Sequence, residues 1–453
     1  MPPSQFPTFR EEAEAFLAAN PDLQTVEVLF SDVSGIFRGK QIPAADLKGL
    51  AAKGMYSPSA HLMLDASGHT DHPLLNPGFE GDPDVWFKPI PGTLKPVPWR
   101  TEKTAQVQTE AFTLDGEPHF ADVRQLLRRT LAPFTAMGLT PVIALELEFY
   151  LLDPRTSPPT PVRPADGSPR LSGTQTMSMD VLDDFLPFVQ AVKAASTAQR
   201  VPVTSVLTEY GDSQFEANLQ HRPDALAAVD DAMCLKRLIK AVARQQGHAA
   251  TFMAKPFAHA SSSGLHVHLS LLDQDGRNIF GGASGAENLR HAVGGLLQLM
   301  PESMLAFCPN ANSYRRLLPG ILLPIEPAWC ANERGVAVRL PVAGDKDARF
   351  EHRAAGADAC PYLVTAAILA ATHFGLTEKI DPGPMTREVD SVRPAPLPNR
   401  WPVAIEKFAA SETLAQYFGQ EFRDVYVRMK RAEEARYHAE IPDRDLEWYF
   451  RTV

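Results

Sequence analysis

Two glutamates, Glu146 and Glu148, occupy one face of a segment that otherwise has the pattern of a buried β-strand. Residues 142–151 alternate with a period of two, so the apolar side chains share one face and the two glutamates share the other. Same-face neighbours on a strand lie about 7 Å apart. Two carboxylates this close in an apolar setting repel each other and lose hydration. Either one of them is protonated or a cation lies between them.

Three further segments carry polar side chains that would complete such a cation site. They are His266, His268 and Ser270 on one face of a strand-like segment, Arg349, Glu351 and Arg353 on one face of another, and Glu209 and Glu216 on either side of a tight turn. Five glutamates and one histidine favour Mg²⁺ or Mn²⁺, which prefer oxygen ligands, over a tetrahedral zinc site. The arginines suit bidentate recognition of phosphate or carboxylate groups.

Each segment has an ordinary explanation when it is considered alone. A single glutamate on an edge strand is usually solvated. A lone His-x-His pair is more often a surface or core feature than a pair of ligands, and residues 349–353 resemble an exposed, salt-bridged strand. Four segments that all interrupt strand patterning with metal-compatible side chains are harder to explain in this way. The sequence therefore favours a metal site.

Composition indicates a large enzyme. The chain has 453 residues, of which 44% are hydrophobic, enough for a substantial core and for two or three domains. Its net charge of −10 argues against a nucleic-acid or anionic membrane partner. Its four cysteines are too widely spaced for a zinc motif and too few for a disulfide scaffold. Reduced thiols, and no apolar run of transmembrane length or signal-peptide pattern, predict a cytoplasmic protein.

Local signals predict several elements of secondary structure. Thr8 and Glu11 form a capping box that opens a short helix. The predicted elements after it are a hairpin over residues 26–42, helices over about 121–137, 223–246 and 286–300, a proline-rich connection over 381–402 and amphipathic helices near the C-terminus. No GxGxxG motif or complete P-loop is present, so a bound nucleotide would be held by metals and arginines.

Seven runs of sequence, in this order, resemble the glutamine synthetase family, and most of all its γ-glutamylputrescine (polyamine) synthetase branch. They are Phe-Arg-Gly-Lys-Gln-Ile-Pro (37–43), Pro-Gly-Thr-Leu-Lys-Pro (91–96), Glu-Leu-Glu-Phe-Tyr-Leu-Leu-Asp (146–153), Ala-Thr-Phe-Met-Ala-Lys-Pro (250–256), Gly-Leu-His-Val-His-Leu-Ser (264–270), Pro-Asn-Ala-Asn-Ser-Tyr-Arg-Arg-Leu (309–317) and Ala-Gly-Ala-Asp-Ala-Cys-Pro-Tyr-Leu (355–363). Any one run is moderately specific, and the ordered set is highly specific.

The resemblance implies an α+β fold. It implies an N-terminal helix over residues 1–20, a small β-grasp domain over 21–112, and a large catalytic domain over 113–453 with a curved antiparallel sheet flanked by helices. It also implies two or more divalent ions, Mg²⁺ or Mn²⁺, in a site between subunits of a homo-hexamer or homo-dodecamer. The expected small-molecule partners are glutamate, an amine and ATP as co-substrate.

The resemblance also assigns roles to individual residues. Glu148, Glu209 and Glu216 match the ligands of a first metal, and Glu146, His266 and Glu351 those of a second. His268, Ser270, Arg339 and Arg349 match nucleotide-binding positions, and Gly264, Arg316, Arg334 and Arg353 match substrate-binding positions. Arg334 and Glu209 are also expected to act in catalysis. Asp32 resembles an aspartate that is lent to a neighbouring subunit's site, where it binds and deprotonates the incoming amine.

The implied reaction joins the γ-carboxylate of glutamate to an amine through a γ-glutamyl phosphate. Members of the family that use ammonia have a glutamate in a flap after Pro-Gly, and Leu322 stands there in this chain. An apolar flap favours an alkylamine or polyamine over ammonia, and a loop near residues 318–326 is expected to exclude water. Ser262 and Glu333 replace a usual glycine and asparagine, which leaves open whether glutamate is the only acid accepted.

The sequence leaves three alternatives to this reaction open. They are an ammonia-using glutamine synthetase, a two-metal phosphohydrolase and a non-catalytic ligand-binding member of the fold. Amine-independent ATP hydrolysis at full rate would favour the phosphohydrolase. Ligand binding without turnover would favour the non-catalytic protein. The sequence favours no particular amine, and neither Mg²⁺ nor Mn²⁺ over the other.

Overall fold

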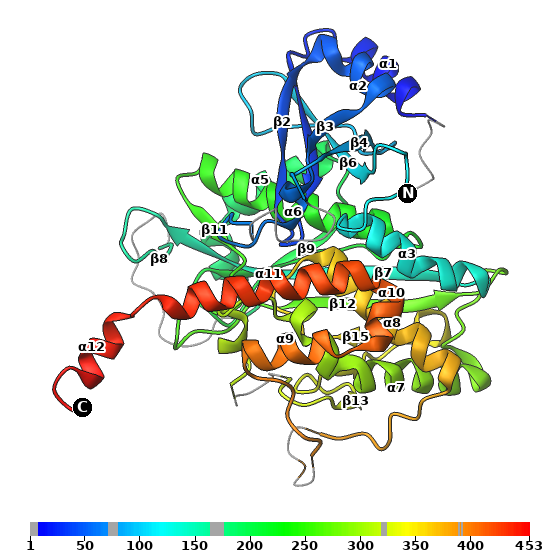
Figure 1. Ribbon diagram of the computed structural model, residues 1–453, viewed down its shortest axis with the longest axis vertical. Coiled ribbons are helices and arrows are strands. Elements are labelled where there is room, and N and C mark those ends of the chain that lie inside the picture. Colours follow the sequence, from blue (N-terminus) through cyan, green and yellow to red (C-terminus); the bar gives the residue numbers. More distant parts are fainter. Residues whose placement is uncertain (1–7, 71–79, 164–175, 319–323, 388–389, 391–392) are drawn as a thin grey trace.

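Two β-sheets organise the chain, with the smaller one near the N-terminus and above the larger one in Figure 1. The computed structural model describes residues 8–70, 80–163, 176–318, 324–387, 390 and 393–453. The chain begins with helix α1 (Phe9–Ala19). The predicted capping box is confirmed, because Glu11 N donates to Thr8 Oγ1 (3.3 Å) and Thr8 N donates to Glu11 Oε2 (3.1 Å).

The small sheet has the strand order β2-β1-β6-β4-β3, and β5 pairs with β6. Its strands are β1 (Thr25–Ser31), β2 (Phe37–Pro43), β3 (Met55–Pro58), β4 (Asp84–Pro89), β5 (Lys95–Pro96) and β6 (Thr104–Phe112). The hairpin of β1 and β2 confirms the prediction for residues 26–42, and β6 runs parallel to β1. Helix α2 (Leu47–Lys53) contacts α1 and β4. This is the mixed arrangement expected of a β-grasp domain.

The large sheet has the strand order β13-β14-β15-β12-β7-β10-β9, with β8 and β11 also paired to β7. Its strands are β7 (Thr140–Asp153), β8 (Thr160–Pro161), β9 (Val203–Thr208), β10 (Gln214–Leu219), β11 (Ala249–Thr251), β12 (Leu265–Leu272), β13 (Trp329–Ala331), β14 (Val338–Leu340) and β15 (Phe350–His352). Among the described strands of this sheet, all paired neighbours are antiparallel except β13 and β14. The expected α+β fold with a largely antiparallel sheet is confirmed.

Helices flank the large sheet. They are α3 (Val123–Ala136), α4 (Met179–Asp184), α5 (Leu186–Ala198), α6 (Ala225–Gln245), α7 (Gly282–Phe307), α8 (Pro361–Glu378), α9 (Trp401–Ala409), α10 (Glu412–Phe418) and α11 (Gln420–Ala439). The last helix, α12 (Asp443–Tyr449), extends away from the sheet. Helix α7 continues through Pro301 beyond its predicted end, and Pro223 lies before the N-cap of α6, Asp224, rather than in its first turn. None of the described helices combines the length and the apolar character that crossing a membrane requires.

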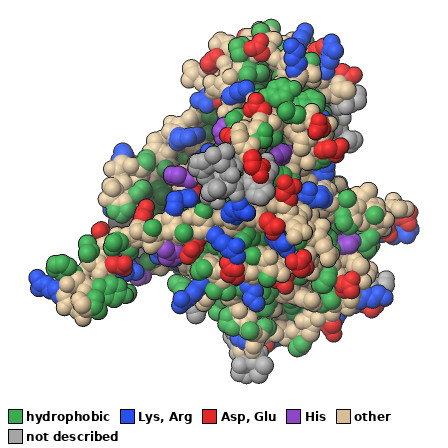
Figure 2. All heavy atoms as spheres, in the orientation of Figure 1, with side chains coloured by type: hydrophobic (Ala, Val, Ile, Leu, Met, Phe, Trp, Pro, Cys, Tyr) green, Lys and Arg blue, Asp and Glu red, His purple; other side chains and the backbone are tan. Residues whose placement is uncertain are grey.

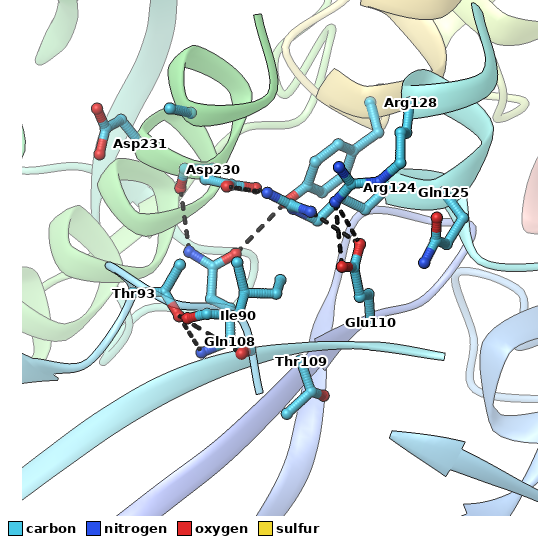
Figure 3. A network of polar contacts seen from close by, with 12 residues as sticks. Ile90, Thr93, Gln108, Thr109, Glu110, Arg124, Gln125, Arg128, Asp230 and Asp231 are labelled. Carbon is cyan, nitrogen blue, oxygen red and sulfur yellow. Dashed lines mark hydrogen bonds and ion pairs between the residues drawn. The ribbon is translucent and has the colours of Figure 1, made fainter. Parts of the chain in front are cut away.

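A buried polar network joins the small sheet to the part of the chain that carries the large sheet (Figure 3). Arg124 on α3 lies between Asp230 on α6 and Glu110 on β6. Its Nε and Nη2 each donate to one carboxylate oxygen of Asp230 at 2.9 Å, and its Nη1 donates to Glu110 Oε2 at 2.8 Å. The Tyr362 hydroxyl on α8 donates to Asp230 Oδ1 at 2.6 Å. Four elements, α3, β6, α6 and α8, therefore share one set of charge-assisted hydrogen bonds. The division of the chain at residues 20 and 112 stays a prediction.

Candidate metal and phosphoryl-transfer site

Sheet register gathers the predicted acidic residues on one face of the large sheet. Glu146 on β7 lies opposite His266 on β12, and Glu148 lies opposite Glu216 on β10. Glu351 on β15 lies opposite His268 on β12. Because same-face residues alternate along each strand, the pairings bring these six side chains together. We call them, together with Glu209 in the turn before β10, the acid cluster.

His266 is at the centre of the acid cluster. Its Nδ1 lies 3.3 Å from Glu146 Oε2, 3.8 Å from Glu351 Oε1 and 4.0 Å from Glu216 Oε2. Its Nε2 lies 3.8 Å from Glu148 Oε1. Two groups of possible ligands share it: Glu146, His266 and Glu351 form one, and Glu148, Glu216 and His266 form the other. Within each group the ligand atoms all lie within 4.8 Å of one another.

His268 is positioned by polar partners on both sides of its ring. Arg349 Nε donates to His268 Nδ1 at 3.4 Å, so the ring proton is assigned to Nε2. Nε2 lies 2.9 Å from Glu146 Oε1. Burial acts to raise the pKa of Glu146, but hydrogen bonds with His266 and His268 hold it well below its usual value. Glu146 is therefore ionised even without a metal.

The remaining carboxyl groups of the acid cluster divide into two electrostatic classes. Burial, and then the charges of Glu146 and Glu148, raise the pKa of Glu216 to about 9. Burial, together with the charge of Glu148, raises the pKa of Glu209 to about 7. Burial also acts to raise the pKa of Glu351, but the charges of Arg353, His266 and His268 outweigh it and lower the pKa. Glu209 and Glu216 are thus the groups that an added cation would most change.

Two arginines neutralise Glu351. Arg339 on β14 is opposite Glu351 in the sheet, and its Nε lies 2.7 Å from Glu351 Oε2. Arg353 Nη1 donates to Glu351 Oε1, and Arg353 Nε donates to the carbonyl oxygen of Arg334 at 3.1 Å. The side chain of Arg334 is exposed. Ser270 lies further along the same face of β12, opposite Val142. Positive side chains therefore border the acid cluster where an anionic substrate would approach.

Arg316 lies beside the acid cluster, against Gly264. Arg316 is 4% exposed, and its Nη1 and Nη2 donate to the carbonyl oxygens of Ala354 (2.8 Å) and Arg353 (2.9 Å). A Cβ atom on Gly264 would lie 2.8 Å from His266 Nε2 and 3.1 Å from Arg316 Nη2. Gly264 is therefore needed to let the arginine and the histidine approach each other. Its backbone N also donates to Glu148 Oε2 at 2.7 Å.

Asp32 is not brought into the acid cluster of its own chain. It is fully buried in the turn between β1 and β2, where Oδ1 accepts from Ser34 N (3.0 Å) and Ile36 N (2.8 Å). Its Oδ2 accepts from Arg38 Nε at 2.7 Å. Burial raises the pKa of Asp32 to about 6, against the hydrogen bond from Ile36 and the charge of Arg38. Its expected role in the site of a neighbouring subunit stays a prediction. Leu322 lies outside the described residues.

Some residues near the acid cluster were not predicted from sequence. Gln214 accepts from Gly211 N through Oε1 (2.9 Å) and donates to the carbonyl oxygen of Ser262 through Nε2 (2.9 Å), which fixes the turn after Glu209. Gln214 shares a strand face with Glu216, so its period-two position was the available signal. His221 packs edge-on against His268, with ring centroids 5.8 Å apart. Its sequence context carries no comparable signal.

The donor set fits a hard divalent cation. The two groups of ligand atoms are oxygen-rich, and the raised pKa values of Glu209 and Glu216 show carboxyl groups that lack a counter-charge. The group of Glu146, His266 and Glu351 coincides with the second ligand set expected from sequence. In the other group His266 stands where Glu209 was expected. The role of each side chain as a metal ligand remains a prediction.

Divalent-cation binding is expected to release protons. At pH 7 the raised pKa values leave Glu216 protonated and Glu209 about half protonated in the metal-free protein, so saturation should expel about one to two protons per chain. Affinity should therefore increase with pH up to about 9. Conversely, the metal-free protein should lose stability as the pH rises from 4.5 toward 9, because the unfolded chain releases these protons first.

Titration calorimetry with Mg²⁺ or Mn²⁺ in buffers of different ionisation enthalpy measures the number of protons released. The thermal midpoint of the metal-free protein across the same pH range checks the second expectation. An affinity for Mg²⁺ or Mn²⁺ that does not change between pH 6 and 9 would show that metal binding does not displace protons from Glu209 and Glu216.

Comparisons with known proteins place this geometry among enzymes that act on glutamate. Residues 120–449 match the family model described as "Glutamine synthetase, catalytic domain". The chain is 35% identical to γ-glutamylputrescine synthetase PuuA of Escherichia coli (strain K12), covering 98% of this chain and 95% of the relative. It is 31% identical to glutamate–isopropylamine ligase of a Pseudomonas species, with 90% and 91% covered. It is 30% identical to a glutamine synthetase of Pyrococcus horikoshii, with 92% and 90% covered.

Solved structures agree with these similarities. The structure titled "Apo GmaS without ligand" superimposes with a TM-score of 0.84 at 27% sequence identity, covering 96% of this chain and 99% of that chain. A second structure, titled "GmaS/ADP complex-Conformation 1", gives the same TM-score, identity and coverage. The similarity therefore extends over both sheets and is not confined to the acid cluster.

Proposed function

The chain belongs to the glutamine synthetase family, and we propose that it is an ATP-dependent ligase that joins the γ-carboxylate of glutamate to an alkylamine or polyamine. The observation that carries the proposal is the acid cluster, in which two groups of ligand atoms share His266 and are bordered by Arg339 and Arg353. Relatives whose names contain γ-glutamylputrescine, isopropylamine and γ-glutamylethanolamide support an amine as the second substrate.

In the proposed reaction the γ-phosphoryl group of ATP is transferred to the γ-carboxylate of glutamate. The amine then attacks the acyl carbon, phosphate leaves, and the amine gives up a proton. Bound Mg²⁺ or Mn²⁺ would neutralise the phosphate charge and align the two anions. The side chains that would hold the ions are Glu146, Glu148, Glu209, Glu216, His266 and Glu351.

The other residues of the site bind, orient and neutralise the substrates. His268, Ser270 and Arg349 would contact ATP. Arg339, beside Glu351, and the exposed Arg334 would face the transferring phosphoryl group. Arg316 and Arg353, with Gly264, would orient glutamate, since the two arginines are already held in place by backbone carbonyl groups. A carboxylate such as Asp32 would accept the proton of the amine.

An amine screen tests the proposal. With glutamate, ATP and Mg²⁺ or Mn²⁺, we expect ADP release to be at least about tenfold faster with putrescine, isopropylamine or ethanolamine than with ammonia, since a pocket shaped for methylene groups gains about 1–3 kcal/mol from each. The amines should be compared at equal concentration of their unprotonated forms. Reactions without amine and without glutamate are the controls.

Each outcome of the screen separates the alternatives. Faster turnover with ammonia would identify an ammonia-using glutamine synthetase, and full-rate ATP hydrolysis without amine would identify a phosphohydrolase. Binding of ATP without turnover would identify a non-catalytic protein.

Leu322→Glu introduces the residue expected of ammonia-using members, and it should shift the preference of the enzyme from alkylamines toward ammonia.

We further propose that the chain assembles into a hexamer or dodecamer with sites between subunits, in the cytoplasm. The C-terminal helix α12 projects away from the body at the lower left of Figure 1, and hydrophobic side chains gather on this arm in Figure 2. Its exposed side chains include Ile441, Leu446, Trp448 and Phe450. An apolar arm of this kind is typical of a contact between protein chains. The four free cysteines suit a reducing compartment.

Polar substitution on the arm tests the assembly. The double variant Leu446→Ser/Trp448→Ser is expected to give a smaller particle in native mass spectrometry, because both side chains are more than half exposed in the single chain. Leu114→Ser changes another exposed leucine, in the turn after β6, and should leave the mass of the particle unchanged. A double variant with the parental mass would exclude the arm from the interface.

A further inference from the structure

A basic cleft lies outside the acid cluster, between strand β2 of the small sheet and helix α6. It has a volume of about 460 Å³. Six basic side chains line it: Arg38, Lys40, Lys236, Arg237, Lys240 and Arg244. The lining contains one carboxylate, that of Glu27. This concentration of positive charge occurs in a chain whose net charge is −10.

The spacing of the basic residues places each set on one side of its own element. Lys236, Lys240 and Arg244 recur at every fourth position of α6 and therefore form a stripe along one side of that helix. Arg38 and Lys40 are two positions apart on β2 and therefore share a face of the strand. The cleft is formed where the helical stripe meets the strand. Like charges at these spacings repel, so the arrangement destabilises the chain unless an anion offsets it.

Internal carboxylates neutralise only part of this charge. Glu27 pairs with Arg237 and with Arg100, the latter at 2.7 Å, and Arg38 pairs with Asp32. Lys236 Nζ donates to the carbonyl oxygens of Ala357 (2.9 Å) and Ala359 (3.3 Å), which carry no full charge. Over the described part of the chain, four of the six lining cations form no ion pair. These are Lys236 and the more exposed Lys40, Lys240 and Arg244.

The floor of the cleft is apolar. Leu29 and Met233 are buried beneath it, and Ile36 in the turn before β2 and Phe37 at the start of β2 also line it. A bare inorganic anion would contact the basic rim and leave this surface uncovered. The volume falls within the range typical of small-molecule sites, about 300–1,000 Å³, in which apolar walls hold the body of a ligand and a few charged groups orient it.

We propose that this cleft binds a small organic polyanion, with two or more carboxylate or phosphate groups on a carbon skeleton, at a site separate from the acid cluster. The unpaired cations of α6 and β2 contact the anionic groups, and the apolar floor contacts the skeleton. A cleft lined by one sign of charge also attracts such a ligand from solution. The proposal concerns a second site and does not depend on which amine the acid cluster uses.

Calorimetric titration of the Mg²⁺-loaded protein at constant ionic strength tests the site. The probes are succinate for carboxylates, fructose 1,6-bisphosphate for phosphate esters and inorganic phosphate as the anion without a skeleton. We expect at least one organic probe to bind once per chain and more tightly than inorganic phosphate. The double variant Lys240→Ala/Arg244→Ala should weaken that binding about tenfold or more, since each substitution removes a charged hydrogen-bond donor to the anion.

Lys193→Ala, on the exposed side of α5, is the matched control and should leave binding unchanged. The double variant should be at least as thermally stable as the parent, because removing two positive charges relieves like-charge repulsion. Its ligase rate without probe should be unchanged. The organic probe that binds better identifies the class of anion. Equal binding to the double variant, binding no tighter than that of inorganic phosphate, or loss of binding through unfolding of the variant would each overturn the proposal.

Discussion

Replacing Glu216 by glutamine is expected to reduce ligase activity by a factor on the order of 10³ or more while making the metal-free protein more stable than the parent at pH 7. Loss of one ligand removes several kcal/mol of charge stabilisation from phosphoryl transfer. The metal-free protein should gain stability, because burial and the neighbouring carboxylates raise the pKa of Glu216 to about 9. At pH 7 the parent must take up a proton at Glu216 when it folds, and the glutamine variant need not. Glutamine then replaces a carboxyl group that is already neutral at pH 7.

A contrasting variant in the same cluster makes this prediction specific. Glu351→Gln should reduce activity to a similar extent, but it should also destabilise the metal-free protein by about 3–5 kcal/mol. Glu351 is 1% exposed and pairs with both Arg339 and Arg353, so its loss leaves two largely buried guanidinium groups without their carboxylate. Two glutamates with the same expected role therefore differ in what they contribute to the fold.

Activity and the thermal midpoint, each measured with chelator and with saturating Mg²⁺ or Mn²⁺, check both variants. The parent should gain about 2.7 kcal/mol at a metal concentration of 100 Kd, and Glu216→Gln should lose most of this gain. Glu117→Gln, in an exposed turn, is the control and should behave as the parent does. The prediction fails if Glu216→Gln keeps more than about a tenth of the activity, or if it keeps the full stabilisation by metal.

The acid cluster could be predicted from sequence because each part of it has a short-range signature. Period-two alternation placed Glu146 with Glu148 and His266 with His268, and both same-face predictions hold in β7 and β12. Which strands pair, and in what register, is decided by contacts between segments that are far apart in the sequence. The position of His266 between the carboxylates therefore came only from the structure.

Elements without periodicity were missed. Helix α8 is apolar around its whole circumference, and residues 361–372 are all buried. An amphipathic pattern arises only where one face meets water, so a fully enclosed helix carries no such signal. The basic cleft was missed for a related reason. The stripe on α6 is visible in the sequence, but nothing local indicates that it faces β2.

Substitution of Asp230 by alanine is expected to cause the largest loss of stability outside the acid cluster, about 3–5 kcal/mol. Asp230 is 5% exposed and accepts two hydrogen bonds from Arg124 and one from Tyr362. Its removal leaves a buried guanidinium with only Glu110 as a carboxylate partner. Urea denaturation followed by tryptophan fluorescence measures the change in free energy of unfolding.

Two controls separate the charge of Asp230 from the other contacts of the network. Tyr362→Phe removes one hydrogen bond and should destabilise by about 0.5–1.5 kcal/mol. Glu406→Ala breaks an exposed pair with Arg431 and should change stability by no more than about 1 kcal/mol, since the side chains of Glu406 and Arg431 are 63% and 52% exposed.

Because Arg124, Asp230 and Glu110 connect α3, α6 and β6, Asp230→Ala should also loosen the small sheet from the catalytic part of the chain. Hydrogen exchange should then increase in β6 before it increases in β12, and unchanged exchange in β6 would show that the two parts are held together by apolar packing instead.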